Sequence, residues 1–306
     1  MSGRTLLIGN PGCSWREWLK EHRKGRPFLC LDPADPVQGV PGQLCLFAGG
    51  KPVISRFYGS LDAQRAPHLL PILVAQALES MPEDLIVQLF PYRPLPLLRH
   101  VTMLVAQLLR PTEILVANGT EIDQSGFPVG PSEIEIESAF PPLVQFAQRK
   151  ALWLRLFEDC QKHAFDLRKA SIEGVRLGTG IRLTSDERQK AHLKDVLYAE
   201  RAGGTLFAVT DLDVEESDVA VALDFTGCTR AQFVAPGMYR NLLCSFAKQS
   251  GEDFGIGIIT DIDWQSLRAF ALSTAIAPAP IRILRIGALR VDSSGRELGE
   301  VRPWQV

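Results

Sequence analysis

Residues 4–16 read RTLLIGNPGCSWR, an apolar run that ends in a turn of glycine, asparagine and proline. The run predicts a strand over residues 4–8, and residues 15–24 after the turn predict an amphipathic helix. A second apolar run at 27–31 predicts another strand, which ends at Asp32. Strand, glycine turn, helix and strand form a βαβ unit, whose crossover helix allows parallel strands to pair. The chain therefore opens as an α/β domain.

The alternation of strands and helices continues to about residue 140. Further predicted strands lie at 44–47, 53–58, 85–90 and 113–117, and predicted helices lie at 67–80 and 96–109. The connections are short, as in doubly wound α/β domains. A longer amphipathic helix at 143–162 is predicted to bridge the two halves of the chain.

The second half of the chain is predicted to be mostly β. Short apolar runs alternate there with Gly, Asp and Pro turns, as in an antiparallel sheet or a small barrel. These runs lie at 205–210, 219–225, 255–260, 268–273, 281–286 and 288–292. We therefore expect an α/β domain over 1–162, including the bridging helix, and a smaller β-rich domain over 163–306.

The composition excludes several classes of protein. Of 306 residues, 46% are hydrophobic and 22% are charged, which predicts a packed core and excludes wholesale disorder. The 33 basic and 35 acidic side chains exclude an overall basic coat. No apolar run reaches the ~18–20 residues that a membrane span needs, so we expect a cytoplasmic protein without membrane contact. The six cysteines lie far apart without a CxxC pair, which predicts free thiols rather than zinc ligands.

Charge is uneven along the second half. Residues 148–204 hold 12 basic and 8 acidic side chains, whereas residues 205–263 hold 3 and 10. A binding groove for an anion is therefore expected nearer the first of these segments.

The turn at residues 9–16 lies where a phosphate-binding loop would lie, between the first strand and the first helix. Backbone N–H groups at such a turn attract anions. A working GxxxxGK[ST] loop also needs a lysine for the outer phosphates and a hydroxyl for magnesium. Counted from Gly9, the last three positions of this motif hold Ser14, Trp15 and Arg16, so both groups are missing. The candidate nucleotide-binding residues are Gly9, Asn10, Pro11, Gly12, Cys13, Ser14, Trp15 and Arg16.

Two interpretations of this turn remain open. A shifted frame would use Ser14 as the hydroxyl and Arg16 or Lys20 as a displaced cation. The alternative is a tight turn between strand and helix that binds no nucleotide.

Two carboxylates, Asp32 and Asp35, follow the second strand. Ligands of open α/β sheets bind at the carboxyl ends of the strands. The two carboxylates could hold a metal ion or accept a proton from a hydroxyl. Alternatively, they only shape a proline-rich turn.

Several motifs around these carboxylates occur together in a known family. Residues 31–38 read LDPADPVQ, and PG at 41–42 and LCL at 44–46 follow. With a one-residue insertion, this order resembles the LDxDxGQ, PG and apolar strand of the polynucleotide 5′-hydroxyl kinases. These are P-loop proteins of RNA 3′-end processing, tRNA splicing and ribosomal RNA maturation.

The resemblance extends over nearly the whole chain. YGS at 58–60 resembles the family's YGxxxP, with Asp62 where the proline would fall, and QLFPY at 88–92 weakly resembles NTxGW. RPTEI at 110–114 resembles KPTHI. In the second half, GIGIITDID at 255–263 resembles GIGIVxxID, and IGALR at 286–290 resembles FGxLRL.

The resemblance implies a P-loop NTPase-like, doubly wound parallel sheet followed by the β-rich domain. It also implies transfer of the γ-phosphate of ATP, with magnesium, to the 5′-hydroxyl of RNA or DNA. The first strand starts at Arg4, so the N-terminal β-domain of eukaryotic members is expected to be absent.

The residues that match the family's motifs have implied roles. Asp32 and Asp35 would orient the hydroxyl and bind magnesium. Gln38 would be the adjacent polar substrate-binding residue, and Tyr92 would stack on a terminal base. Packing beside prolines is the alternative for Tyr92.

Two arginines on the predicted bridging helix also have implied roles. Arg149 and Arg155 fall where the family places lid arginines, which would stabilise phosphoryl charge. The alternative for both is a solvated helix face.

The departures from the loop motif leave two hypotheses. The first is a divergent kinase that uses Arg16 or Lys20 as its cation. The second is a pseudokinase, a binding module for RNA or a protein partner, in which Trp15 fills the phosphate site or packs against Trp18. An open loop with a cation pointing into it favours the first, and a loop plugged by Trp15 favours the second.

Overall fold

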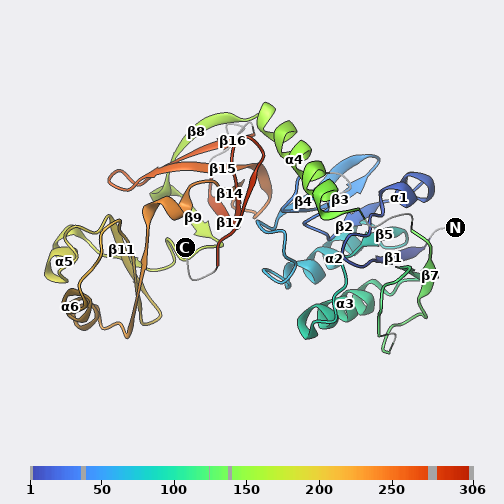
Figure 1. Cartoon of the computed structure of the whole chain (residues 1–306), viewed down its shortest axis with the longest axis horizontal. Coiled ribbons are helices and arrows are strands. Elements are labelled where there is room, and N and C mark those ends of the chain that lie inside the picture. The colour runs from blue at the N-terminus through green and yellow to red at the C-terminus, as the bar shows by residue number, and fades with distance from the viewer. Residues whose placement is uncertain (1–2, 36–38, 124, 137–139, 275–280, 303–306) are drawn as a thin grey trace. The chain divides into compact units, whose positions relative to one another are not determined.

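The computed structural model describes residues 3–35, 39–123, 125–136, 140–274 and 281–302 (Figure 1). The chain forms two compact units, Met1–Leu154 and Arg155–Val306. The division between them falls inside helix α4 (Pro142–Glu158). The domain boundary at 162/163 stays a prediction.

A seven-stranded sheet forms the centre of the first unit, in the order β4-β3-β2-β5-β1-β6-β7. The strands are β1 (Arg4–Ile8), β2 (Phe28–Cys30), β3 (Gln43–Ala48), β4 (Lys51–Phe57), β5 (Leu85–Gln88), β6 (Glu113–Ala117) and β7 (Ser132–Ile134). The neighbouring pairs β2–β5, β5–β1, β1–β6 and β6–β7 are all parallel. The β3–β4 hairpin extends the sheet beyond β2, with β3 antiparallel to β2 and β4 antiparallel to β3. The predicted α/β class with a parallel, doubly wound sheet is confirmed.

Strands β1 and β2 are parallel but they are not neighbours. We expected these first two strands to pair directly, and the structure corrects this, because β5 lies between them. Thr5 and Phe28 both pair with Ile86 of β5. The carboxyl ends of β1 and β2 therefore lie at the same edge of the sheet, one strand apart, and this edge positions the candidate site.

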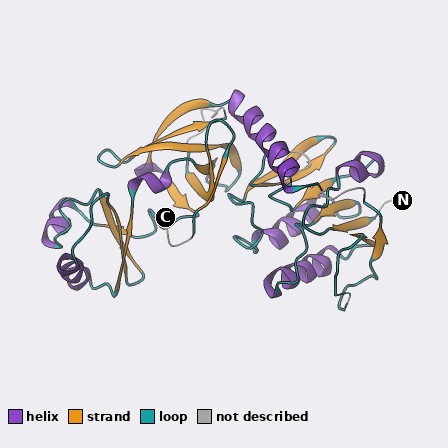
Figure 2. Ribbon diagram, viewed as in Figure 1, coloured by secondary structure: helices purple, strands orange, loops and turns teal. Residues whose placement is uncertain are grey.

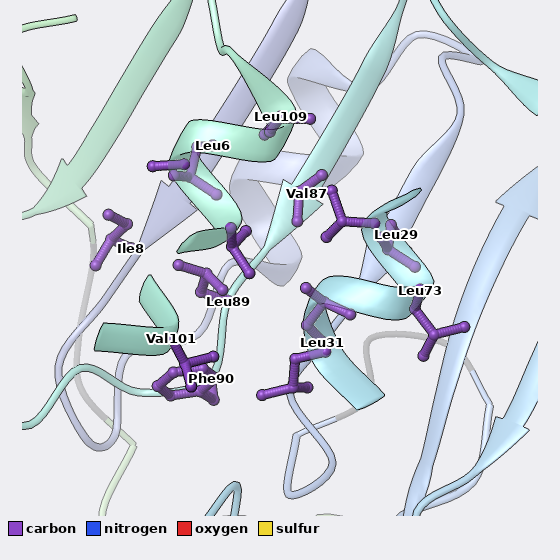
Figure 3. Packing of buried hydrophobic residues seen from close by; sticks show 14 of the residues in the cluster. Leu6, Ile8, Leu29, Leu31, Leu73, Val87, Leu89, Phe90, Val101 and Leu109 are labelled. Carbon is purple, nitrogen blue, oxygen red and sulfur yellow. The ribbon is translucent and has the colours of Figure 1, made fainter. Parts of the chain in front are cut away.

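Side chains alternate between the two faces of the sheet, as the pleat requires. Leu6 and Ile8 lie in a core with helices α2 (Leu69–Ser80) and α3 (Pro96–Leu109), part of which Figure 3 shows. Leu7, between them in sequence, lies in a second core with helix α1 (Arg16–His22). Helices thus cover both faces of the sheet.

Helix α3 has the bounds that were predicted for it, and its two ends show why. Pro96 occupies the first turn, where its missing N–H is tolerated, and Arg110 ends the helix in a left-handed conformation. Of the helices that the structure describes, none combines the length and apolar character needed to cross a membrane.

The second unit is built mainly of strands, as Figure 2 shows. Its larger sheet is antiparallel along the order β18-β17-β14-β15-β16-β8, and β9 pairs in parallel with β17. These strands are β8 (Gln161–Asp166), β9 (Ser171–Glu173), β14 (Leu242–Ala247), β15 (Asp253–Asp263), β16 (Arg268–Ser273), β17 (Ile283–Val291) and β18 (Glu297–Glu300). The short helix η1 (Leu167–Lys169) connects β8 to β9. The predicted β-rich part is confirmed.

A four-stranded sheet lies in the chain between β9 and β14. It has the order β10-β11-β12-β13 and consists of β10 (Ile181–Arg182), β11 (Tyr198–Ala202), β12 (Thr205–Val209) and β13 (Arg230–Val234). Helix α5 (Ser185–Lys190), helix α6 (Glu216–Thr226) and the short helix η2 (Pro236–Tyr239) belong to the same stretch. The chain thus leaves the larger sheet after β9 and returns to it at β14.

The strand predicted at 219–225 is wrong, because these residues lie in helix α6. Strands β12 and β13 are parallel, so the chain must cross over between them, and α6 provides the crossover. Acidic residues in the first turn and Gly227, left-handed at φ +68°, delimit the helix.

Two further boundaries differ from the prediction. The bridging helix ends at Glu158 rather than at residue 162, and the chain enters β8 at Gln161. The two strands predicted at 281–286 and 288–292 are the single strand β17. The glycine at 287 suggested a turn, but it marks only a shift in the register of β17 against β14.

Candidate functional site

The candidate site lies at the carboxyl ends of β1 and β2. The turn after Ile8 follows β1, and Asp32 follows β2 after one intervening residue. This is the edge where open α/β sheets bind their ligands. The structure therefore brings the predicted loop and the predicted carboxylates to one edge of the sheet.

The loop is a tight turn rather than an open cradle. The Cys13 N–H donates a hydrogen bond to the Asn10 carbonyl oxygen at 3.1 Å, and Gly12 has φ +98°. Proline followed by a positive-φ glycine is the signature of a type II turn. Because Pro11 has no N–H and the Cys13 N–H is already bonded, two backbone donors are not available to a phosphate.

Neighbouring backbone groups hold the turn in place. The Gly9 carbonyl accepts from the Tyr92 N–H at 2.7 Å, and the Gly12 carbonyl accepts from the Phe140 N–H at 3.0 Å. The Asn10 amide donates to the Gly119 carbonyl at 3.4 Å. The turn is therefore fixed by contacts from three other segments of the first unit.

Trp15, at the position of the loop lysine, is buried in the core. Its side chain is only 1% exposed and lies in the cluster that contains Leu7 and Leu19. Its ring meets that of Trp18 edge to face, with centroids 6.0 Å apart. The indole supplies bulk beneath the loop and no cation.

Gly9 has no room for a side chain because the residues after it lie against its α-carbon. A Cβ at this position would lie 2.7 Å from Cys13 Sγ and 3.2 Å from Trp15 Nε1. Cys13 and Trp15 thus occupy the space beside the first glycine of the loop.

Neither proposed replacement cation points freely into the loop. Arg16 donates to Asp35 at 2.9 Å, and Lys20 pairs with Glu17 at 2.6 Å on the exposed surface of α1. The Ser14 hydroxyl is buried and has no hydrogen-bond partner within the described part of the chain. The sequence did not reveal the Arg16–Asp35 pair, because these residues are 19 positions apart.

Asp32 is a buried carboxyl, 3% exposed, that accepts a hydrogen bond from the Ala34 N–H at 2.9 Å. Burial, with the charge of Asp35 added, raises its pKa to about 7, although backbone hydrogen bonds and Arg149 oppose the shift. Burial and the same two carboxylates raise the pKa of the Cys13 thiol to about 12. Cys13 therefore stays a thiol at neutral pH and is no nucleophile.

The residues present do not fit the ATP–magnesium arrangement of a phosphate loop. Asp35 is already bound by a guanidinium, which competes with a metal ion for the carboxylate. No group of three or more His, Cys, Asp or Glu side chains that could hold a metal occurs in the described ranges. Trp15 and Arg16 replace the lysine and the magnesium hydroxyl.

The remaining predicted site residues are in different places. Tyr92 is 6% exposed and belongs to the core around β1, and its role in stacking on a terminal base stays a prediction. Arg149, on α4, is half-buried and its charge acts on Asp32. Arg155 is exposed on α4 in the second unit. Gln38 lies outside the described residues.

Comparisons with known proteins identify two curated relatives. A polyribonucleotide 5′-hydroxyl-kinase of Pyrococcus furiosus is 25% identical over 154 residues, which are 49% of this chain and 42% of the relative. Another, from Thermococcus kodakarensis, is 26% identical over 220 residues, 65% of this chain and 57% of the relative. The match thus spans about half the length of these relatives. No family model matches the chain.

Solved structures of Clp1p in complex with Pcf11p share the fold. Two such structures match with TM-scores of 0.56 and 0.57 and identities of 13% and 11%, covering 94% of this chain and 74% of the matched chain. The ordered motifs, the curated relatives and this fold together make the chain similar to the polynucleotide 5′-hydroxyl kinase-like proteins.

Proposed function

We propose that the chain is a pseudokinase, a kinase-like protein that binds polynucleotides without transferring phosphate to them. The observation that carries this proposal is the burial of Trp15 at the position of the loop lysine. Phosphoryl transfer depends almost wholly on positioning and on neutralising phosphate charge. Here the loop offers fewer backbone donors, and Arg16 is paired with Asp35.

RNA is the polynucleotide that the relatives suggest. Both curated relatives are polyribonucleotide 5′-hydroxyl-kinases by name, so an RNA 5′ end is the ligand we infer for this chain. The solved neighbours are complexes with the protein Pcf11p, which supports a protein partner as an additional role.

Nucleotide binding and phosphate transfer can be tested on the full chain. We expect no rise in melting temperature with ATP and magnesium, because only a ligand that binds the folded state stabilises it. We also expect no transfer of labelled γ-phosphate to a 5′-hydroxyl RNA or DNA oligonucleotide. The Pyrococcus furiosus relative, assayed in parallel, is the positive control. A shift of several degrees, or labelling above background, would overturn the proposal.

One observation favours the second candidate, a divergent kinase. The pKa of Asp32, raised to about 7, suits a general base that accepts the proton of a 5′-hydroxyl. To bind ATP and magnesium, such a kinase would have to release Arg16 from Asp35, or Lys20 from Glu17, to serve as its cation. The labelling assay decides between the two candidates. If the wild-type chain labels RNA, Asp32→Asn and Asp35→Asn should each abolish the labelling.

A further inference from the structure

Two adjoining cavities lie in the second unit, away from the loop and the carboxylates of the first. One has a volume of about 190 Å³ and the other of about 520 Å³, and both are lined by Arg168 and Ala170. Arg168 belongs to η1, and Ala170 connects this helix to β9. The two cavities therefore lie next to each other and share these two residues in their walls.

The larger cavity is cationic. Arg168, Lys169 and Arg282 line it, together with Ser171 and Gln249, and none of its lining residues is acidic. Asp166 binds Arg168 through both carboxylate oxygens, each at 2.8 Å. Lys169 and Arg282 form no ion pair with any residue in the described ranges. Two cations beside a hydroxyl and an amide are therefore available to an anion such as a phosphate.

The smaller cavity is largely apolar. Leucine and isoleucine side chains line it, with Tyr198 and Arg182 at its wall. The Arg182 guanidinium lies over the Tyr198 ring, 5.7 Å from its centroid. Because Tyr198 is only 6% exposed and Arg182 covers its ring, the cavity offers apolar side chains and the guanidinium plane of Arg182 to a ligand. Guanidinium planes are among the surfaces on which unstacked bases of RNA stack.

A buried carboxylate fixes the wall of this cavity. Glu200 is fully buried and accepts hydrogen bonds from the Tyr198 hydroxyl at 2.6 Å, the Gly178 N–H at 3.0 Å and the Thr179 N–H at 3.3 Å. These bonds hold the tyrosine and the glycine loop in one arrangement, so the cavity is pre-formed.

We propose that the two cavities together bind a segment of single-stranded RNA, with phosphate in the larger cavity and a base or ribose in the smaller one. The inference rests on the RNA binding of the proposed function and gives it a location. An acidic peptide would use the cations but would leave the apolar cavity without a matched group. A nucleotide of a polynucleotide matches both, because it joins an anion to a flat ring that stacks through its faces and forms hydrogen bonds through its edges.

Charge reversal tests the larger cavity. Binding of a fluorescent single-stranded RNA oligonucleotide to the full chain is measured by polarisation over a range of salt concentrations. We expect Lys169→Glu/Arg282→Glu to weaken binding by at least about tenfold at low salt. The slope of log affinity against log salt should fall by about 1.4, because each phosphate contact on a single strand contributes about 0.7.

A matched control separates this site from general attraction. Lys190→Glu/Lys194→Glu makes the same change in net charge at exposed positions of the same unit and should leave the affinity near that of the wild type. If the wild type and both double variants bind RNA equally well, the inferred site is wrong. The proposed function still stands in that case, because the chain binds RNA. An absence of RNA binding by the wild type overturns both. Phosphate transfer in the labelling assay overturns only the proposed absence of catalysis.

A neutral substitution tests the smaller cavity. Ala170→Leu adds bulk where the cavities meet and changes no charge, so it should weaken RNA binding several-fold without changing the salt slope.

Competition identifies the ligand. Unlabelled RNA should displace the probe, whereas inorganic phosphate or an acidic peptide at matched ionic strength should not. Equal displacement by either competitor would overturn the assignment to RNA.

Discussion

At the scale of single residues, Trp15 and Arg16 decide what the loop can do. Both substitutions are visible in the sequence once the motif is counted from Gly9. What the sequence did not reveal is where the two side chains go. Trp15 packs inward because its indole buries a large apolar area, and Arg16 reaches Asp35 because the ends of β1 and β2 share one edge of the sheet.

Removal of the Trp15 ring should strongly destabilise the chain. We expect Trp15→Ala to lower the free energy of unfolding by about 3–5 kcal/mol, because it leaves a cavity in a packed core. Urea denaturation, followed by circular dichroism, measures the change. Trp18→Ala, which removes a ring that is only partly buried, is the control and should cost less. Equal losses would mean that Trp15 does not fill the core.

Asp32 should make stability depend on pH. Its pKa of about 7 in the folded chain lies above the ordinary value of 3.8, so the folded state holds this proton longer than the unfolded state. The free energy of unfolding should therefore fall as pH rises from about 4 to about 7, by roughly 4 kcal/mol if no other group compensates.

Asp32→Asn isolates this contribution. Asparagine does not titrate and keeps an oxygen for the Ala34 N–H, so the variant should gain stability relative to the wild type as pH rises through this window. Parallel denaturation curves at pH 5 and pH 8 measure the difference. A constant difference between the two proteins would place the pKa of Asp32 near its ordinary value.

At the scale of elements, the loop between β1 and α1 and the segment between β12 and β13 show what a sequence pattern can predict. Strand β1 and its turn follow from an apolar run and an Asn-Pro-Gly signal, and both occur as predicted. Residues 219–225 form a helix because the parallel pairing of β12 and β13 requires a crossover. That pairing joins strands distant in sequence, so the local pattern could not show it.

The turn of the loop should tolerate little change at Gly12. Its φ of +98° is unfavourable for any residue with a side chain, so we expect Gly12→Ala to cost about 1–2 kcal/mol of unfolding free energy. Gly12→Asn, which accepts positive φ more readily, should cost less. Thermal denaturation of both variants gives the comparison, and a neutral effect of alanine would contradict the type II turn.

At the scale of the whole molecule, the order of motifs predicted the family and the two-part organisation better than it predicted chemistry. The motifs are spread from residue 31 to residue 290, so they cover both units. The candidate site depends on pairings such as Arg16 with Asp35, which local spacing does not encode. The basic excess over 148–204 was the only sequence signal for the cationic cavity. It includes Arg168 and Lys169 but not Arg282, which directly precedes β17 and is far from them in sequence.

The departure of the chain from its larger sheet after β9 and its return at β14 has a consequence for the smaller cavity. Both strands pair with β17, so the intervening stretch leaves and re-enters the larger sheet beside the same strand. The stretch from β10 to β13, here called the insert, packs against the larger sheet, because Tyr198 and Phe207 lie in the same buried cluster as Phe246. Tyr198 and Arg182 belong to that insert, while Leu167 and Leu267 belong to the scaffold. Substitutions in the insert would therefore reshape one side of the smaller cavity, while the side formed by Leu167 and Leu267 would stay as it is.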